Sequence, residues 1–178
     1  MTSMELLARS QKSAVLSADE TCRFQLCRAL CREDWATTTL PGFVAWVLNN
    51  PSTADAELDD PTVRKCWTYT LRWGYGAMMF VNTNPWRSTD PKGARVPHED
   101  YLLANDSWLR YAVGQCPYVV AAWGDRANRD LAMRAVNIIH PIGPLHALRV
   151  TQSGNPQHPL YLPGDLQPQL WKPNTGLN

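Results

Sequence analysis

The segment that most constrains the fold is an apolar, β-prone run, Gly42–Leu48, which passes directly into a polar stretch that ends at Thr62. Such a run is typical of a central strand that is covered on both faces. The polar stretch is rich in amides, hydroxyls and carboxylates, and Asp60 followed by Pro61 indicates the start of a helix. Ligands of open α/β sheets bind beyond the carboxyl ends of the strands. We therefore expect the loop 49–62 to contribute to a binding site.

The pattern after this loop alternates between helix and strand. Val63, Cys66, Trp67, Thr70 and Leu71 recur at the spacing of one helix face, and Gly74 is a suitable end for that helix. Further strands are predicted over 76–81, 117–123 and 146–150, and further helices over 98–113 and 127–138. The N-terminal part predicts a short helix over 4–11, a strand or helix over 21–30, and a loop over 36–41.

Alternating strands and helices favour a parallel sheet with right-handed crossovers. We predict the α/β class: a three-layer α/β/α sandwich around a short, mainly parallel four-stranded sheet, with 21–30 as an extra N-terminal edge strand. A length of 178 residues suits one domain. We assign residues 1–20 to an N-terminal extension, 21–163 to a single α/β domain and 164–178 to an irregular C-terminal tail.

Composition narrows the classes of protein. The formal net charge of +1 argues against binding long duplexes mainly by phosphate neutralisation, so any nucleic-acid contact must come from a local patch. No signal peptide is apparent, and no apolar run approaches the ~20 residues that span a bilayer. We expect a cytoplasmic protein without membrane contact, with five reduced cysteines. A metal site at Cys22, Cys27 and Cys31 is the less favoured alternative to buried or incidental thiols.

Several known chemistries are excluded by their missing motifs. The chain has no GxxxxGK[ST] phosphate loop, no GxGxxG, no GxSxG and no HExxH. Its four histidines are not at metal-ligand spacing. We expect no cofactor and no metal, so any chemistry must come from asparagine, aspartate and histidine side chains.

Polar or turn-forming clusters follow all four expected strands of the domain. They cover 49–62, 82–87, 124–126 and 151–163. Because the carboxyl ends of parallel strands meet at one edge of a sheet, we expect these four loops to form one site.

Each candidate residue also has a purely structural interpretation. Asp60 and Asp125 both suit a helix cap, and Asn50 before Pro51 can stabilise a simple turn. The same alternative applies to Asn82, Asn84, Trp86, Trp123 and His158, which can stabilise turns, anchor loops or pack in the core.

Five blocks along the chain resemble the signature of a small bacterial and phage family known as a domain of unknown function. The resemblance extends from about Cys22 to Trp171 and names no reaction. The blocks are Asn50-Pro51-Ser52-Thr53-Ala54-Asp55, Asp59-Asp60-Pro61-Thr62, Trp73-Gly74-Tyr75-Gly76, Ala122-Trp123-Gly124 and His158-Pro159-Leu160-Tyr161-Leu162-Pro163.

The order of the motifs is also similar, more distantly, to the uracil-DNA glycosylase superfamily, which has a three-layer α/β/α fold. That resemblance implies that Asn50 positions or activates water, that Asn82 or Asn84 reads the base edge, and that His158 follows the last strand. The run 117–124 matches the third-strand motif, and Leu160 with Tyr161 matches the wedge loop. Leu48 stands where the superfamily usually has a glycine.

The implied chemistry suits these residue types. A histidine that donates a hydrogen bond to the departing base stabilises the negative charge of the transition state. An amide presents a donor and an acceptor side by side to a base edge, and an apolar wedge fills the gap left by an extruded base. We assign catalysis to Asn50, Asp55 and His158. We assign substrate binding to Ser52, Thr53, Asn82, Asn84, Trp86, Arg87, Trp123, Leu160 and Tyr161.

The sequence thus predicts an N-glycosylase-like hydrolase that acts on a base in a nucleotide or nucleic acid. The alternative is a non-catalytic module that binds a nucleotide or a nucleic-acid base, in phage DNA modification or in defence. A third reading is an interaction protein with exposed tryptophans. The sequence leaves open the substrate, the oligomeric state, and the choice among DNA, RNA and free nucleotide.

Overall fold

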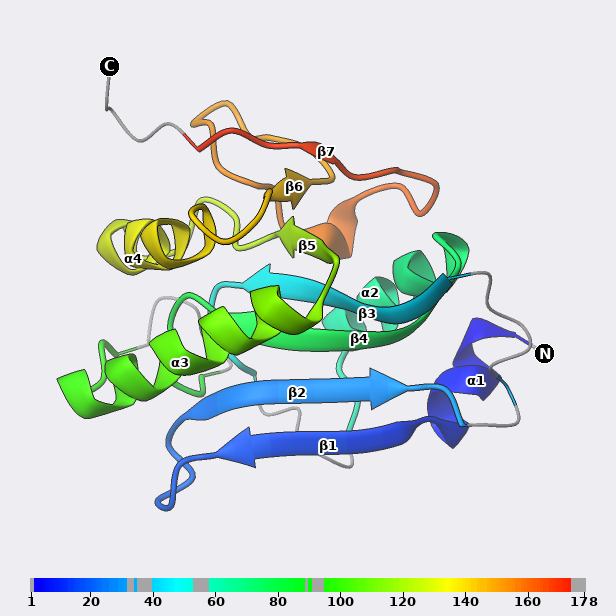
Figure 1. The fold of residues 1–178 in the computed structure, drawn as a ribbon, viewed down its shortest axis with the longest axis horizontal. Coiled ribbons are helices and arrows are strands. Elements are labelled where there is room, and N and C mark those ends of the chain that lie inside the picture. Colours follow the sequence, from blue (N-terminus) through cyan, green and yellow to red (C-terminus); the bar gives the residue numbers. More distant parts are fainter. Residues whose placement is uncertain are drawn as a thin grey trace.

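The computed structural model describes residues 2–31, 34, 40–52, 58–88, 90 and 95–173. Four parallel strands form the middle of its sheet (Figure 1). They are β4 (Tyr75–Asn82), β3 (Leu40–Leu48), β5 (Tyr118–Ala121) and β6 (His146–Ala147), in that spatial order. The expected strands are therefore present, although β6 is shorter than the predicted 146–150. Val150 forms only an isolated bridge with Pro156.

Antiparallel strands extend this parallel unit on both sides. β2 (Arg23–Ala29) pairs with β4, β1 (Gln11–Leu16) pairs with β2, and β7 (Gln169–Leu170) pairs with β6. The sheet thus has seven strands in mixed directions, in the order β1-β2-β4-β3-β5-β6-β7. The predicted four-stranded sheet with one extra edge strand was too small, because β1 and β7 lie in segments that we predicted as extension and irregular tail.

Helices cover both faces of the sheet (Figure 1). α1 (Ser3–Arg9) and α2 (Pro61–Arg72) pack on one face, and α3 (Glu99–Gln115) and α4 (Arg129–Ile139) pack on the other. Strand alternation divides the core in the same way. Val44 and Trp46 of β3 point toward α2, whereas Ala45 and Val47 point toward α3 and α4. Among the described residues, no helix is long and apolar enough to cross a membrane.

Local signals account for most helix ends. The Asp60 carboxylate accepts a hydrogen bond of 2.8 Å from the Val63 N–H at the start of α2, as its position before Pro61 predicts. Gly74, with φ +87°, follows the end of α2. The expected cap at Asp125 was wrong: Asn128 caps α4 by accepting from the N–H groups of Asp130 and Leu131. The predicted loop 36–41 lies largely outside the described residues.

Candidate functional site

A cavity of about 620 Å³ lies at the carboxyl ends of the parallel strands. Its wall includes residues from the segments that follow β3, β4, β5 and β6, together with one residue of β2 and the start of α2. Three of the four loops that we expected to converge therefore do so around one cavity, whereas no residue of 82–87 lines it and only the following residue, Ser88, does. Its lining residues include Arg23, Leu48, Asn49, Asn50, Ser52, Asp60, Val63, Phe80, Ser88, Trp123, Gly124, Asp125, Arg126, Thr151, Gln157, His158, Leu160 and Tyr161.

The deep part of the cavity is apolar. Leu48 of β3, Phe80 of β4 and Val63 of α2 line it, and all three belong to the core cluster on the α2 face of the sheet. Phe80 is only 1% exposed, so it lines the buried end of the cavity. A flat, apolar ligand group can bury its surface here.

Arg23 reaches this cavity because of a β-bulge. Val15 pairs with Gln25 while Leu16 pairs with Arg23, which leaves Phe24 as an extra residue in β2. The ring of Phe24 instead lies 6.4 Å from that of Tyr101 in α3. If β2 paired regularly through Phe24, without the bulge, alternation would place Arg23 on the α3 face with Gln25. The sequence analysis missed Arg23 because a bulge has no distinct signal in a single strand.

The position of His158 depends on the turn after β5. Gly124, with φ +73°, donates its N–H to the Pro156 carbonyl oxygen at 2.8 Å. A Cβ at residue 124 would lie 3.5 Å from the His158 Cβ, and its positive φ also favours glycine. This turn therefore joins the loops after β5 and β6 and brings His158 to the cavity.

The imidazole of His158 is a neutral hydrogen-bond donor. Its Nδ1 accepts from the Leu160 N–H at 3.3 Å, which requires Nδ1 to be unprotonated and assigns the ring proton to Nε2. Burial lowers the pKa of His158 below the ordinary 6.5, although the charge of Asp60 opposes this shift. Nε2 has no hydrogen-bond partner among the described residues. It is therefore available to a ligand.

The Asp60 carboxylate caps α2 and also lines the cavity. One carboxylate oxygen caps α2, and the other accepts a hydrogen bond from the Ser52 hydroxyl. The preceding residue, Asp59, forms ion pairs with Arg28 at 2.7 Å and with Lys12 at 3.0 Å. Because the Arg28 side chain is fully buried in the sheet, these pairs hold the start of α2 in place. They thereby fix the carboxylate of Asp60 relative to His158.

Asn50 holds two loops together. Its amide nitrogen donates to the carbonyl oxygens of Pro51 (3.1 Å) and Ser88 (2.9 Å), so both of its N–H groups are used within the protein. Its amide oxygen accepts from the Asn49 side chain at 3.2 Å. Asn50 therefore offers a ligand or a water molecule only the remaining acceptor capacity of its oxygen.

Asn82 is a buried amide that has no partner among the described residues and does not itself line the cavity. Its side chain is 0% exposed, and neither its nitrogen nor its oxygen forms a hydrogen bond to any described residue. Asn82 pairs in register with Leu48 and lies two residues beyond Phe80, so strand alternation directs it to the face of the sheet that carries the cavity. Buried amides normally have partners, and an exception needs an explanation.

Three other predicted residues turn away from the cavity. Asn84 accepts from the Trp86 N–H and donates to the Arg95 carbonyl, at 3.0 and 2.9 Å, so its amide stabilises a turn. Trp86 forms a bridge with Cys22, and Arg87 donates to the Glu20 carbonyl. None of the three lines the cavity. Their structural interpretation accounts for the contacts that we see.

The remaining predicted residues divide into two groups. Trp123 lines the cavity, but its ring also packs edge-on against Trp171, with centroids 5.3 Å apart. Leu160 and Tyr161 lie in the short 3-10 helix η2 (Pro159–Tyr161), and the Tyr161 side chain is 88% exposed at the cavity rim. Thr53 and Asp55 lie outside the described residues.

Asp125 fastens the loop that follows β6. Its carboxylate accepts from the Thr151 hydroxyl at 2.7 Å and from the Asn155 amide at 2.8 Å. The hydrogen bond from Asn155, followed by that from Thr151, lowers the pKa of Asp125. Asp125 therefore stabilises the hairpin that precedes His158, a role that its sequence position did not indicate.

Three of the five thiols do not suit nucleophilic chemistry at neutral pH. Burial raises the pKa of Cys27 and of Cys116 to about 12, and it raises the pKa of Cys66 as well. Within the described residues, no group of three or more His, Cys, Asp or Glu side chains is arranged to hold a metal ion.

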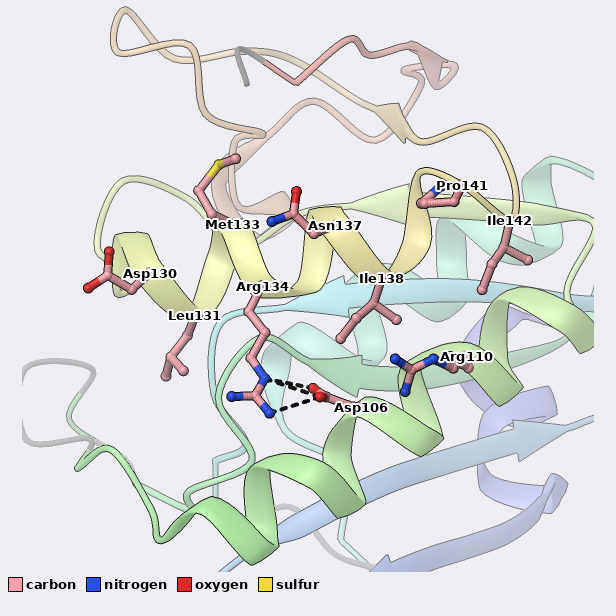
Figure 2. Close-up of a pocket in the computed structure, with 10 residues that line it drawn as sticks. All are labelled: Asp106, Arg110, Asp130, Leu131, Met133, Arg134, Asn137, Ile138, Pro141 and Ile142. Atoms are coloured by element: carbon pink, nitrogen blue, oxygen red, sulfur yellow. Dashed lines mark hydrogen bonds and ion pairs between the residues drawn. The ribbon is translucent and has the colours of Figure 1, made fainter. Parts of the chain in front are cut away.

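A second concavity, of about 750 Å³, is a surface trough between α3 and α4. Figure 2 shows Arg134 of α4 reaching across it to Asp106 of α3. The guanidinium forms hydrogen bonds of 2.9 to 3.1 Å with Asp106, and another of 2.8 Å with Glu99. These bonds, led by those of Asp106, raise the pKa of Arg134. Arg134 is thus already paired within the protein, whereas Arg110, another cation of the trough, is exposed.

The fold and the cavity define an α/β protein with a candidate ligand site at the carboxyl edge of its parallel strands. Residues 23–160 match the family described as "Protein of unknown function (DUF1643)", and the chain belongs to that family. This confirms the predicted membership of a domain-of-unknown-function family. Comparisons with curated proteins and with solved structures gave no match. The more distant resemblance to uracil-DNA glycosylases stays a prediction.

Proposed function

We propose that the cavity binds a nucleobase and that the protein hydrolyses the N-glycosidic bond that joins this base to its sugar. The observation that carries the proposal is the state of His158: a neutral imidazole that lines the cavity and whose Nε2–H has no partner among the described residues. Breaking the glycosidic bond moves negative charge onto the base. A fixed N–H donor at the base oxygen stabilises that charge in the transition state.

Asn82 and Phe80 supply base recognition in this proposal. An amide offers a donor and an acceptor side by side, which matches one edge of a pyrimidine. The amide of Asn82 is buried on the cavity face of the sheet and lacks a described partner, so a base edge that reached it would satisfy its donor and acceptor. Phe80 would lie against the flat face of the base.

The attacking water needs an acceptor for its proton. The water oxygen forms a bond to the sugar carbon as the bond from that carbon to the base nitrogen breaks, and one water proton passes to the acceptor. Asp60 is the described carboxylate closest to this role, because it lines the cavity and its charge already acts on His158. Asp55, our sequence-based candidate, lies outside the described residues.

Two substitutions of His158 separate its chemistry from its structural hydrogen bond. His158→Asn keeps an acceptor for the Leu160 N–H but removes the Nε2–H donor, whereas His158→Gln keeps a donor near Nε2 but loses the acceptor. Free base released from a panel of nucleosides, nucleotides and base-modified oligonucleotides would be measured by chromatography. We expect His158→Asn to lower the rate roughly 100-fold or more with little change in Tm, and His158→Gln to retain more activity.

Equal turnover by wild type and His158→Asn would refute this role of the imidazole. Absence of product with every substrate would leave the second candidate: a module that binds a base without hydrolysing it. The state of Asn50 favours this alternative, because both of its N–H groups already bind protein carbonyls and cannot orient water. A rise in Tm with a nucleotide, without release of base, would identify such a module.

A further inference from the structure

Arg126 is a cation on the cavity wall that has no partner in the described part of the chain. It follows the Gly124 turn at the end of β5, lines the cavity and is exposed. No described residue forms a hydrogen bond or an ion pair with its guanidinium. Arg23, the other arginine of the wall, differs because it is buried and has interactions within the protein.

The polar side chains near Arg126 already form hydrogen bonds with other groups of the protein. The Asp125 carboxylate accepts from Thr151 and Asn155. Asn128 caps the first N–H groups of α4, so this helix end does not offer free donors at Asp130 and Leu131. The guanidinium of Arg126 is therefore the group of this loop that remains available to an anion.

We infer that Arg126 binds the phosphate of a ligand whose base occupies the cavity. This inference rests on the proposed function and specifies its substrate class: a phosphorylated nucleoside rather than a free base or a nucleoside. The phosphate belongs either to a mononucleotide or to a strand, since both present the same anionic oxygens. A planar guanidinium binds such oxygens through two parallel N–H donors.

The arrangement of the cavity supports this ligand shape. Apolar groups gather at its buried end, where Leu48 and Phe80 are 7% and 1% exposed. Arg126 lies at the solvent side of the same cavity. A ligand with a flat base at one end and an anion at the other matches both ends, whereas a nucleoside would leave the guanidinium unpaired.

Binding of nucleosides and of their 5′-monophosphates to the full chain tests the inference by calorimetry. The variant is Arg126→Gln, and the control is Arg129→Gln, which removes an exposed arginine three positions later that does not line the cavity. We expect the monophosphate of the preferred base to bind wild type about tenfold more tightly than its nucleoside. Arg126→Gln should remove this advantage and leave nucleoside affinity unchanged, whereas Arg129→Gln should preserve it.

The outcomes separate the inference from the function on which it rests. If nucleosides bind and the phosphate adds no affinity, or if Arg126→Gln retains the advantage, the inference is wrong and base binding stands. If neither nucleosides nor nucleotides nor oligonucleotides bind, both are wrong. An oligonucleotide that contains the preferred base distinguishes the phosphate sources: tighter binding than the mononucleotide, with the same loss in Arg126→Gln, would assign the phosphate to a strand.

Discussion

The two concavities of this protein differ in how their polar groups are satisfied. In the trough between α3 and α4, Arg134 is bonded to Asp106 (Figure 2) and also to Glu99, so these three charged groups are satisfied within the protein. At the strand ends, the Nε2 of His158 in the cavity lining and the buried amide of Asn82 on the same face of the sheet lack partners among the described residues. Such groups cost stability in the isolated protein. The difference indicates that the trough serves the fold, whereas the cavity is prepared for a ligand.

The largest effect on base affinity should come from a substitution of Asn82. Asn82→Leu replaces an unpartnered buried amide by an apolar group of similar size, so we expect an equal or higher Tm together with at least a tenfold loss of base affinity. The matched change, Asn84→Leu, removes two hydrogen bonds and should lower stability by about 1 to 3 kcal/mol. Thermal unfolding and calorimetry measure both properties. A clear loss of stability in Asn82→Leu would show that its amide has a structural role.

A substitution in the trough should lower stability and leave ligand affinity unchanged. Asp106→Asn keeps the shape of the side chain but weakens its ion pair with Arg134, so we expect a loss of about 1 kcal/mol. Raising the salt concentration should reduce this difference. Ligand affinity should be unchanged, and a change in affinity would contradict the division between the two concavities. Urea unfolding at low and high salt provides the measurement.

The pH dependence of stability should report His158. Because burial lowers its folded pKa below the unfolded value of 6.5, the unfolded chain binds more protons between these two values. The stabilising contribution of the neutral ring is thus complete above pH 6.5 and is lost as the pH falls to the folded pKa. We expect the slope of stability against pH in this window to flatten in His158→Asn. An unchanged slope would show that another group dominates.

The smallest effect should be a shift in a titration. Asp60→Asn keeps an oxygen that can cap α2 but removes the charge that favours protonated His158. The pKa of His158 should therefore fall further below 6.5, while the Tm changes little. NMR titration of the imidazole measures this shift. A rise in the pKa would mean that Asp60 does not act on the ring through its charge.

Local sequence signals predicted the parts of the fold that depend on near neighbours. Asp60-Pro61 marked the start of α2, and the spacing of Val63, Cys66 and Trp67 identified its buried face. The apolar run of β3 was correctly read as a central strand that is covered on both faces. These features follow from capping and periodicity, which act over a few residues.

The edge strands of the sheet could not be predicted from local sequence signals. β7 contains only Gln169 and Leu170, and its pairing with β6 depends on contacts between distant segments. The bulge at Phe24, which directs Arg23 into the cavity, becomes visible only when β1 and β2 are paired. A pattern of two residues, or one extra residue in a strand, carries too little periodicity to be recognised alone.

By itself, the sequence determined which strand ends carry polar loops, because strand order and alternation are local properties that parallel pairing converts into a common edge. Only the tertiary structure decided what each polar side chain does there. In the structure, Asn50, Asn84 and Asp125 form hydrogen bonds within the protein. The Nε2 of His158, the amide of Asn82 and the guanidinium of Arg126 have no partner among the described residues. The physical reason is that a hydrogen bond is satisfied in space, by groups that the chain brings together from distant positions.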